Sequence, residues 1–281
     1  MMDSRQIVVG IDGSESSWQA LMWAAHAAAV RRVPLITLHA GSAETAHGLW
    51  RQADAFVKER FADARCVPEL AETTAAQALI AASDHAALIV VGRRGRGALP
   101  DLLLGSTSLQ VSMHAHCPVA VVRGNTAQDG PIVVGVDSSP HSQGALEYAF
   151  LEANLTGRPV LALHVYASGL MGYPDALIPV PDAETEHDQA TELLARELLP
   201  WQEAFPDVRT EQQAVPGSPA HILVPRTEAA SVVVVGSRGL GGFAGLLLGS
   251  TGQALVHHAR CPVVIARLRA GAHGAWAHLP S

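Results

Sequence analysis

The amino-acid sequence contains one pattern twice, and this duplication limits the folds open to the chain more than any other feature. The stretch IVVGIDGS at 7–14 returns as IVVGVDSS at 132–139, and ALIVVGRRGRG at 87–97 returns as SVVVVGSRGLG at 231–241. The offset is 125 residues for the first match and 144 for the second, so the second copy carries 19 more residues. A chain of 281 residues can hold two domains that each bury a core. We therefore predict two domains of one design, at 1–124 and 130–268, and a flexible tail at 269–281.

Within each copy, apolar β-branched runs alternate with longer segments of helical pattern. Runs such as LIVVG and VVVVG are continuously apolar, which is typical of parallel strands covered on both faces. In the first copy we predict strands near 6–11, 34–40, 65–70, 87–92 and 118–123, and helices near 15–31, 49–62, 74–84 and 106–115. In the second copy the strands are predicted near 131–136, 159–165, 207–214, 231–236 and 262–267. The alternation indicates α/β sheets with right-handed crossovers.

Three further segments refine this prediction. The additional residues of the second copy fall mainly at 166–188, where the Gly and Pro content predicts an ordered surface loop. Pro225 lies inside the helical pattern HILVPRTEAA, where it should kink or break the helix. The last strands, VAVVR and VVIAR, are apolar enough to pair the two copies edge to edge, which would cover exposed sheet edges.

Charge and hydropathy exclude several classes of function. The net charge is −7 and no basic stripe occurs, which argues against nucleic-acid binding because such binding depends on neutralising phosphates. No apolar run approaches the roughly 20 residues that a membrane-spanning helix needs. The first residues also lack the pattern of a signal peptide, so we expect a cytoplasmic protein.

Cysteines and histidines do not predict a redox or metal site. Cys117 and Cys261 each precede Pro-Val at a strand entrance, and we interpret them as small buried hydrophobic residues. Four of the fourteen histidines lie on the last helix of a copy, match no metal-ligand spacing and have no carboxylate beside them: His114, His116, His257 and His258. We expect these to be surface or interface histidines and predict no metal ligands.

The most informative motif is a glycine-rich stretch after the fourth strand of each copy. It reads GRRGRGALPDLLLGST at 92–107 and GSRGLGGFAGLLLGST at 236–251, with the same spacing between the first glycines and the final Gly-Ser-Thr. Ligands of open parallel sheets bind beyond the carboxyl ends of the strands, and a helix N-terminus there attracts phosphate. Glycines allow positive φ angles and a close approach of backbone amides to an anion. We interpret the stretch as an anion cradle anchored by its leucines; the alternative is a tight connection that binds nothing.

The pattern G-x2-G-x9-G-[ST], with VGIDGS or VGVDSS on the first strand and CPV before the last, resembles the ATP-binding branch of the universal stress protein family. The resemblance covers residues 5–123 and 130–267. With two copies in tandem, the chain is similar to the actinobacterial and mycobacterial stress and dormancy proteins of this family. It implies two tandem, doubly wound, five-stranded parallel α/β sheets of order 3-2-1-4-5, paired through their last strands. The candidate ATP-binding residues are Gly10, Asp12, Ala40, Gly92, Arg93, Arg94, Gly95, Arg96, Gly97, Gly105, Ser106 and Thr107 in the first copy, and Gly135, Asp137, Val165, Gly236, Ser237, Arg238, Gly239, Leu240, Gly241, Gly249, Ser250 and Thr251 in the second.

The resemblance also implies roles for some of these residues. Ala40 and Val165 would offer backbone groups to adenine. Asp12 and Asp137 would lie at the ribose or metal-bridged end of the nucleotide, or would instead cap the helices that follow. The serines and threonines of the Gly-Ser-Thr segments would add hydroxyl donors to phosphate oxygens.

The two copies differ at positions near the expected site. Arg93 stands where the second copy has Ser237, either as a phosphate partner or as a solvated charge. Thr73 replaces Gly217 before the third helix, which should reshape that turn in the first copy. His39 and His164 lie near the end of the second strand, where a structural role and a ligand contact remain alternatives.

These observations favour a regulatory protein of the stress or dormancy response that holds ATP with Mg²⁺ in each domain. No GxSxG elbow, P-loop lysine or nucleophile–base pair is present, so we predict no catalytic residues and at most slow, incidental ATP hydrolysis. A homodimer and an unidentified protein partner are further expectations. The alternatives are a nucleotide-independent interaction scaffold and an enzyme acting on adenylated or phosphorylated small molecules.

Overall fold

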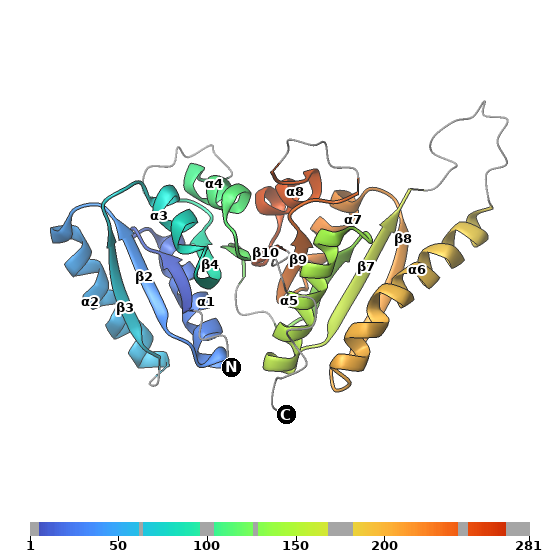
Figure 1. Ribbon diagram of the computed structural model, residues 1–281, viewed down its shortest axis with the longest axis horizontal. Helices are drawn as coiled ribbons and strands as arrows, with labels where there is room; N and C mark the ends of the chain where they lie inside the picture. Colours follow the sequence, from blue (N-terminus) through green and yellow to red (C-terminus); the bar gives the residue numbers. More distant parts are fainter. Residues whose placement is uncertain are drawn as a thin grey trace. The chain divides into compact units, whose positions relative to one another are not determined.

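The computed structural model in Figure 1 describes residues 6–61, 64–95, 104–125, 129–167, 182–240 and 247–267. The chain divides into two compact units, one made of residues 1–127 with 256–265 and the other of residues 128–255 with 266–281. The predicted tail at 269–281 lies outside the described residues.

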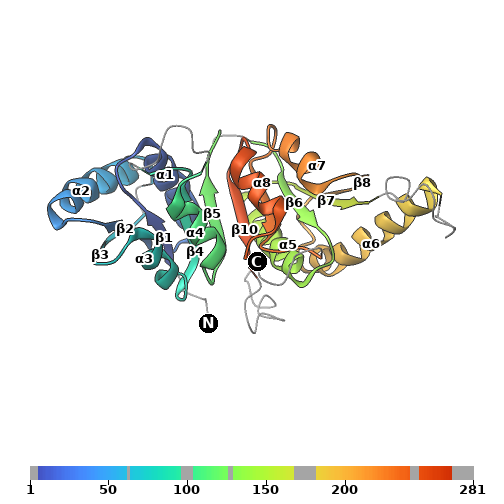
Figure 2. The same cartoon turned by 90° about the horizontal axis from the view of Figure 1, so that it is seen from above.

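The first unit is a parallel sheet with helices on both faces. Its elements are β1 (Gln6–Gly10), α1 (Glu15–Arg31), β2 (Leu35–Ala40), α2 (Ala43–Arg60), β3 (Cys66–Ala71), α3 (Ala75–Ala82), β4 (Ala86–Gly92), α4 (Ser106–His114) and β5 (Val119–Val122). The strand order β3-β2-β1-β4-β5 confirms the predicted 3-2-1-4-5 winding. Figure 2 shows α1 and α2 on one face of this sheet and α3 and α4 on the other.

The last strand of the second repeat, β10 (Val263–Ala266), also contributes to the first unit. It runs antiparallel to β5, with Val263 opposite Val121 and Ile265 opposite Val119. The predicted pairing of the two repeats through their last strands is therefore confirmed, and β5 has no free edge.

The second repeat has the same design. Its elements are β6 (Ile132–Val136), α5 (Pro140–Thr156), β7 (Val160–Tyr166), α6 (Ala183–Ala204), β8 (Thr210–Pro216), α7 (Pro219–Arg226), β9 (Val232–Gly236) and α8 (Ser250–His258). The strands follow the order β10-β9-β6-β7-β8, which is again 3-2-1-4-5 within the repeat. The backbone N–H of Ser237 donates to the carbonyl of Ala266 at 3.0 Å, which ties the end of β9 to the end of β10.

The core explains why the central strands are continuously apolar. Ile7, Val8 and Val9 of β1 have no exposed surface, because helices cover both faces of the strand. In the second unit, Phe150 of α5 is fully buried and stacks against Trp201 of α6 with ring centroids 6.1 Å apart. The edge strand β3 is instead largely exposed, including Val67 and Leu70.

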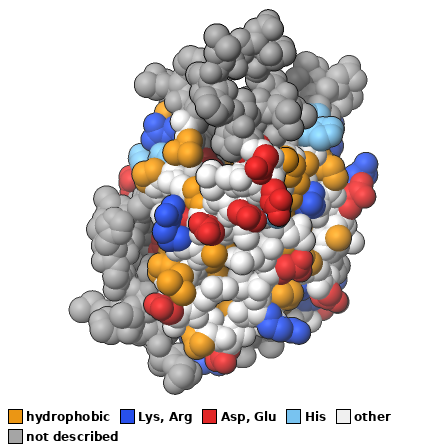
Figure 3. Space-filling model, turned by 90° about the vertical axis from the view of Figure 1, so that its right-hand side faces the viewer, with side chains coloured by type: hydrophobic (Ala, Val, Ile, Leu, Met, Phe, Trp, Pro, Cys, Tyr) orange, Lys and Arg blue, Asp and Glu red, His pale blue; other side chains and the backbone are white. Residues whose placement is uncertain are grey.

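The outer side of the second unit is acidic. Figure 3 looks from the α6 and β8 side of Figure 1 and shows acidic side chains gathered among uncharged and hydrophobic ones. Glu184, Glu192 and Glu203 of α6 are among the exposed residues. They form the solvated face of an amphipathic helix whose opposite face buries Leu194 and Leu198.

Most differences from the predicted elements have a local cause. Helix α2 starts at Ala43 and not near 49, because the side chain of Ser42 accepts a hydrogen bond from the Thr45 N–H and caps the helix. The predicted loop at 166–188 is wrong at both ends, since Tyr166 belongs to β7 and α6 already begins at Ala183. Residues 168–181 lie outside the described part of the chain.

Proline has the effect predicted for α7. Pro225 is the second-last residue of this helix, which ends at Arg226. A proline lacks an N–H donor and crowds the preceding turn, so the helix cannot continue far beyond it. Among the helices that the structure describes, none is both long and apolar enough to cross a bilayer.

Candidate functional site

The turn between the first strand and first helix has the same hydrogen bonds in both repeats. Ser14 is the N-cap of α1 and Ser139 the N-cap of α5, each accepting from an N–H three residues on at 3.2 Å. Oδ1 of Asp12 accepts from the Ser14 N–H, and Oδ1 of Asp137 from the Ser139 N–H, both at 3.0 Å. The caps are therefore the serines, and the alternative that the aspartates cap these helices is wrong. The aspartates form the turn that precedes the cap.

The glycine loop after the fourth strand folds back onto these aspartates. Oδ2 of Asp137 accepts a hydrogen bond from the Leu240 N–H at 3.0 Å. A Cβ atom added to Gly95 would lie 2.6 Å from Oδ2 of Asp12, and one on Gly239 would lie even closer to Oδ2 of Asp137. Only glycine lets the loop approach the carboxylate this closely. The carboxylate thus holds the loop of the second repeat through a hydrogen bond, and the loop of the first repeat approaches its aspartate in the same way.

Glycine at the strand end has a separate cause. A Cβ on Gly92 would overlap the backbone carbonyl of Ser16 in α1, and a Cβ on Gly236 would lie 2.8 Å from the backbone carbonyl of His141 in α5. None of the described loop glycines at 92, 95, 105, 236, 239 and 249 has a positive φ angle. Our expectation of positive φ is therefore wrong for these six. At 92, 95, 236 and 239 the reason for glycine is instead a neighbouring atom that lies too close for a Cβ. Arg96, Gly97 and Gly241 lie outside the described residues.

A helix begins where the glycine loop ends. Ser106 and Ser250 are the first residues of α4 and α8, as predicted. The loop closes just before them, because the Gly105 N–H donates to the Arg93 carbonyl and the Gly249 N–H to the Ser237 carbonyl, each at 2.9 Å. The hydroxyl-bearing residues of this segment remain accessible: Ser106 and Ser250 are exposed, and Thr107 and Thr251 are half-buried.

The leucines before these helices anchor the loop only in part. Leu104 and Leu248 are buried, as the prediction requires. Leu247 is 41% exposed, so the prediction is wrong for this residue. Among the described leucines, one buried side chain thus stands directly before each Gly-Ser-Thr, and Leu102, Leu103 and Leu246 lie outside the described residues.

Positive charge gathers at both cradles. In the first, burial and the neighbouring Arg94 lower the pKa of Arg93, while burial and then Arg93 lower the pKa of Arg123 to about 10. In the second, burial and then Arg238 and Arg267 lower the pKa of His141, and Asp137 opposes this shift. Cations that disfavour one another's charge create a positive potential, which an anion would relieve.

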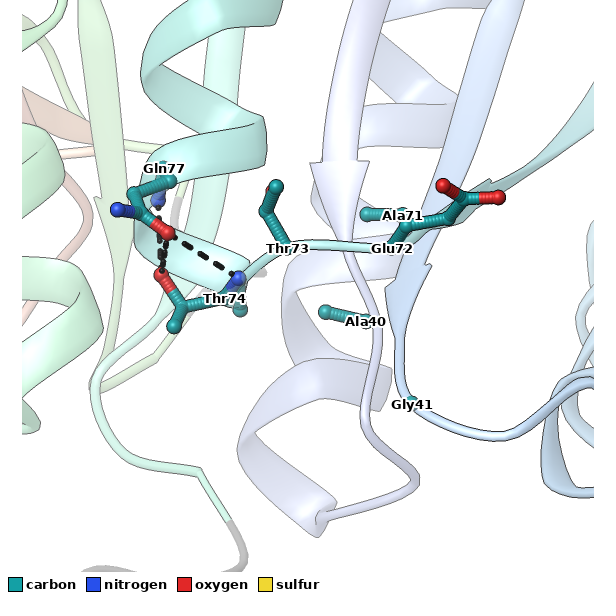
Figure 4. Close-up of a pocket in the computed structure, with 8 residues that line it drawn as sticks. Ala40, Gly41, Ala71, Glu72, Thr73, Thr74 and Gln77 are labelled. Atoms are coloured by element: carbon teal, nitrogen blue, oxygen red, sulfur yellow. Dashed lines mark hydrogen bonds between the residues drawn. The ribbon is translucent and has the colours of Figure 1, made fainter.

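A pocket of about 520 Å³ lies beside the first cradle, at the ends of β2 and β3. In Figure 4, Ala40 and Gly41 lie below the segment that runs from Ala71 through Thr73 and Thr74 into α3. Thr74 caps α3 through a reciprocal pair of hydrogen bonds with Gln77. The structure therefore places Ala40 with the start of α3 in a pocket that the described residues of the glycine loop do not line. Sequence reasoning named Ala40 and Thr73 but missed Gly41, Glu72 and Gln77, because no motif marks these residues.

The turn before the third helix differs between the repeats, as predicted. Gly217 has a φ of 141°, whereas Thr73 is not among the described residues with positive φ. Ser218 makes no side-chain capping bond, unlike Thr74. The Gly217 N–H instead donates to the carbonyl of Tyr166 at 2.9 Å.

The paired histidines of the second strand have a structural role. Nδ1 of His39 lies 2.8 Å from the carbonyl oxygen of Ile11, and Nδ1 of His164 lies 2.8 Å from that of Val136. A carbonyl only accepts, so each Nδ1 carries the proton and donates. These bonds tie the end of the second strand to the first, which favours the structural alternative over ligand contact.

The other histidines and cysteines do not form a metal site in the described structure. His116 lies beyond the end of α4, contrary to prediction, with Nδ1 2.8 Å from Oδ1 of Asp84. His257 and His258 end α8. Cys117 and Cys261 are buried, as predicted. Across the described ranges, no three His, Cys, Asp or Glu residues gather closely enough to hold a metal ion.

Ser138 is under backbone strain at the second cradle. Its φ is 59°, where the first repeat has Gly13 with φ 79°, and its buried Oγ has no hydrogen-bond partner among the described residues. We expect Ser138→Gly to raise the free energy of unfolding by about 1 kcal/mol, because the left-handed conformation disfavours a Cβ atom by roughly that amount. Chemical denaturation measures this, with Gly13→Ser as the matched control that should lower stability. A less stable Ser138→Gly protein would contradict the expectation.

Comparison with known proteins places this geometry in a family. The model of the universal stress protein family matches residues 4–123 and again 130–267. A universal stress protein of Mycobacterium tuberculosis (strain H37Rv) is 37% identical over 289 residues, covering 93% of this chain and 96% of the relative. One from Mycolicibacterium smegmatis is 35% identical over 289 residues, covering 94% and 97%. The crystal structure of a universal stress protein from Archaeoglobus fulgidus superposes with a TM-score of 0.66 at 20% identity, covering 96% of this chain and 100% of that one.

The family matches coincide with the two repeats, and the relatives extend over nearly the whole chain. The duplicated strand–loop–helix corner described above lies inside both matched regions. The chain is therefore a tandem member of the universal stress protein family.

Proposed function

We propose that each repeat binds an adenine nucleotide, ATP with Mg²⁺, in its glycine cradle. The observation that carries this proposal is the duplicated corner, in which a glycine loop, the start of a helix and a group of cations converge beyond the carboxyl ends of β1 and β4, or of β6 and β9. Backbone amides at a helix start and nearby guanidinium groups are the donors that phosphate prefers.

The residues present suit the parts of such a ligand. The accessible hydroxyls of Ser106 and Thr107, with the amides at the start of α4, would hold phosphate oxygens. The pocket beside Ala40 has room for a base and offers backbone groups at the end of β2. In the second repeat, Ser250 and Thr251 take the place of the first pair.

The aspartates fit a hard cation that accompanies the phosphates. Each oxygen of Asp137 accepts one backbone hydrogen bond, and a carboxylate oxygen has a second lone pair. Mg²⁺ prefers such oxygen ligands and neutralises phosphate charge when bound. Asp12 occupies the same position in the first repeat.

We infer a switch and not a catalyst. Apart from the long 3.5 Å contact between Ser237 Oγ and His141 Nδ1, the hydrogen bonds that support this inference at the described cradle residues are those of turns, caps and loop closure. Ligand binding would favour the ordered loop over other loop conformations, and a partner protein would distinguish the two states.

Native mass spectrometry of freshly purified protein tests the proposal. We expect up to two adenine nucleotides for each chain and, after their removal, calorimetric binding of ATP with Mg²⁺. The double variant Gly95→Glu/Gly239→Glu should lose both, because the new side chains fill the cradles. Absence of co-purified nucleotide together with absence of calorimetric binding would reject the proposal, and an unchanged cellular phenotype of the double variant would favour the interaction scaffold.

A further inference from the structure

The two cradles differ by an exchange at two facing positions. Ser16, the second residue of α1, faces a loop that begins with Arg93. In the second repeat, His141 is the second residue of α5 and the loop begins with Ser237. The surrounding caps and aspartate hydrogen bonds have equal lengths in the two repeats. The exchange therefore replaces an arginine on the loop with a titratable histidine on the helix, within an unchanged backbone framework.

His141 lies at the base of the second glycine loop. Its Nδ1 is 3.5 Å from Oγ of Ser237, at the limit of hydrogen bonding. A Cβ on Gly236 would lie 2.9 Å from the Cβ of His141, so loop and helix are in direct contact here. In the first repeat the smaller Ser16 instead accepts a hydrogen bond from the Arg94 N–H through its Oγ at 3.3 Å.

The groups around His141 make its charge depend on an anion. The charges of Arg238 in the loop and Arg267 after β10 disfavour the protonated form of His141, and the charge of Asp137, directly after β6, favours it. Burial and then the two arginines lower the pKa of His141 from its ordinary value, so the imidazole is neutral at physiological pH. His141 also lies in the first turn of α5, where the positive end of the helix dipole disfavours the imidazolium further.

We propose that His141 is the titratable phosphate-binding residue of the second cradle, in place of the permanent charge of Arg93 in the first, so that polyphosphate binding there takes up a proton. This inference rests on the proposed nucleotide binding and adds to it a difference between the two sites. The proton comes from solvent and is held on the imidazole, with no covalent change in the ligand.

The sign of the expected pH dependence follows from linkage. A polyphosphate adds negative charge beside His141 and raises its pKa in the complex above that of the free protein. Affinity therefore increases as the pH falls through the interval between the two pKa values. One proton per site limits the gain to about tenfold for each pH unit of that interval. Arg93 stays protonated throughout, so the first site lacks this contribution.

Calorimetric titration of the full chain with ATP and Mg²⁺ between about pH 6 and pH 8 tests the proposal. Buffers of different ionisation enthalpy report the number of protons taken up. The terminal phosphate of the nucleotide also titrates in this range, so the measured quantity is the difference between wild type and His141→Ser, which introduces the residue of the first repeat. His141→Gln, which keeps the size but not the titration, serves as a second variant if the serine variant folds poorly.

We expect one of the two sites in wild type to bind up to about tenfold more tightly at the lower pH, with proton uptake that both variants lose. If the variants bind ATP with the same pH dependence and proton uptake as wild type, His141 has no such role, although nucleotide binding stands. If wild type gives no binding heat at any pH, the proposed function itself fails.

Discussion

Replacing Gly239 with alanine is expected to weaken nucleotide binding at the second cradle strongly while the first continues to bind. The new Cβ would overlap Oδ2 of Asp137, and the clash separates the loop from the carboxylate that accepts the Leu240 N–H. Hydrogen bonds to charged groups contribute about 1.5–3 kcal/mol each. Losing this hydrogen bond between loop and carboxylate, together with one contact of the loop to the proposed phosphate, therefore weakens binding by roughly 100-fold or more, since about 1.4 kcal/mol corresponds to tenfold.

Calorimetric stoichiometry measures this loss directly. The Gly239→Ala protein should bind one nucleotide for each chain where wild type binds two, and Gly95→Ala should silence the other site for the same reason, with Asp12 as the displaced group. Gly48→Ala is the matched control, because a Cβ at this position in α2 meets no atom within 4 Å. Two sites of unchanged affinity in Gly239→Ala would show that the contact with the aspartate does not shape the cradle.

The fold could be predicted because the signal for each strand is local. LIVVG and VVVVG are apolar throughout, and they are the buried strands β4 and β9 between two helical layers. The start of α2 could not be located in the same way, because it depends on one capping serine, Ser42, in a polar stretch that has no clear periodicity. Helix caps involve single hydrogen bonds, whereas strands involve whole apolar runs.

The position of the candidate site could be predicted from the sequence, but the physical reason for its glycines could not. The repeated spacing located the glycine loop and the helix start that follows it. The reason for Gly239 is its approach to Asp137, 102 positions earlier in the chain, which no local pattern reveals. The sequence favoured positive φ angles because that is the commonest use of glycine in loops.

The residues facing the loop from the first helix were missed for a related reason. Ser16 and His141 become part of the cradle only because α1 and α5 begin against the glycine strand ends. A signal was available, since aligning IDGSES with VDSSPH places serine opposite histidine in an otherwise repeated turn. Differences between internal repeats are informative where the backbone is the same.

The glycine that ends β4 should matter more for stability than any other residue of the first loop. In Gly92→Ala the new Cβ would overlap the backbone carbonyl of Ser16 and lie 2.6 Å from its carbonyl carbon. Neither backbone can move easily, because the flanking Val91 and Ser17 are buried. Overpacking of this kind lowers the free energy of unfolding by about 2–3 kcal/mol. Hydrogen exchange of β4 amides, followed by mass spectrometry, measures the loss within the first unit.

A graded series makes this prediction specific. Gly236→Ala, where the nearest backbone atoms of His141 are 2.8 Å from the added Cβ, should destabilise the second unit by a smaller amount. Gly48→Ala should instead stabilise the chain by about 0.5–1 kcal/mol, since alanine is preferred to glycine inside a helix and this Cβ meets open space. The order of the three effects tests whether strand–helix contact is the reason for glycine. Equal stability of Gly92→Ala and Gly48→Ala would mean that α1 can withdraw from β4 without loss, so that contact between the helix start and the strand end does not position the cradle.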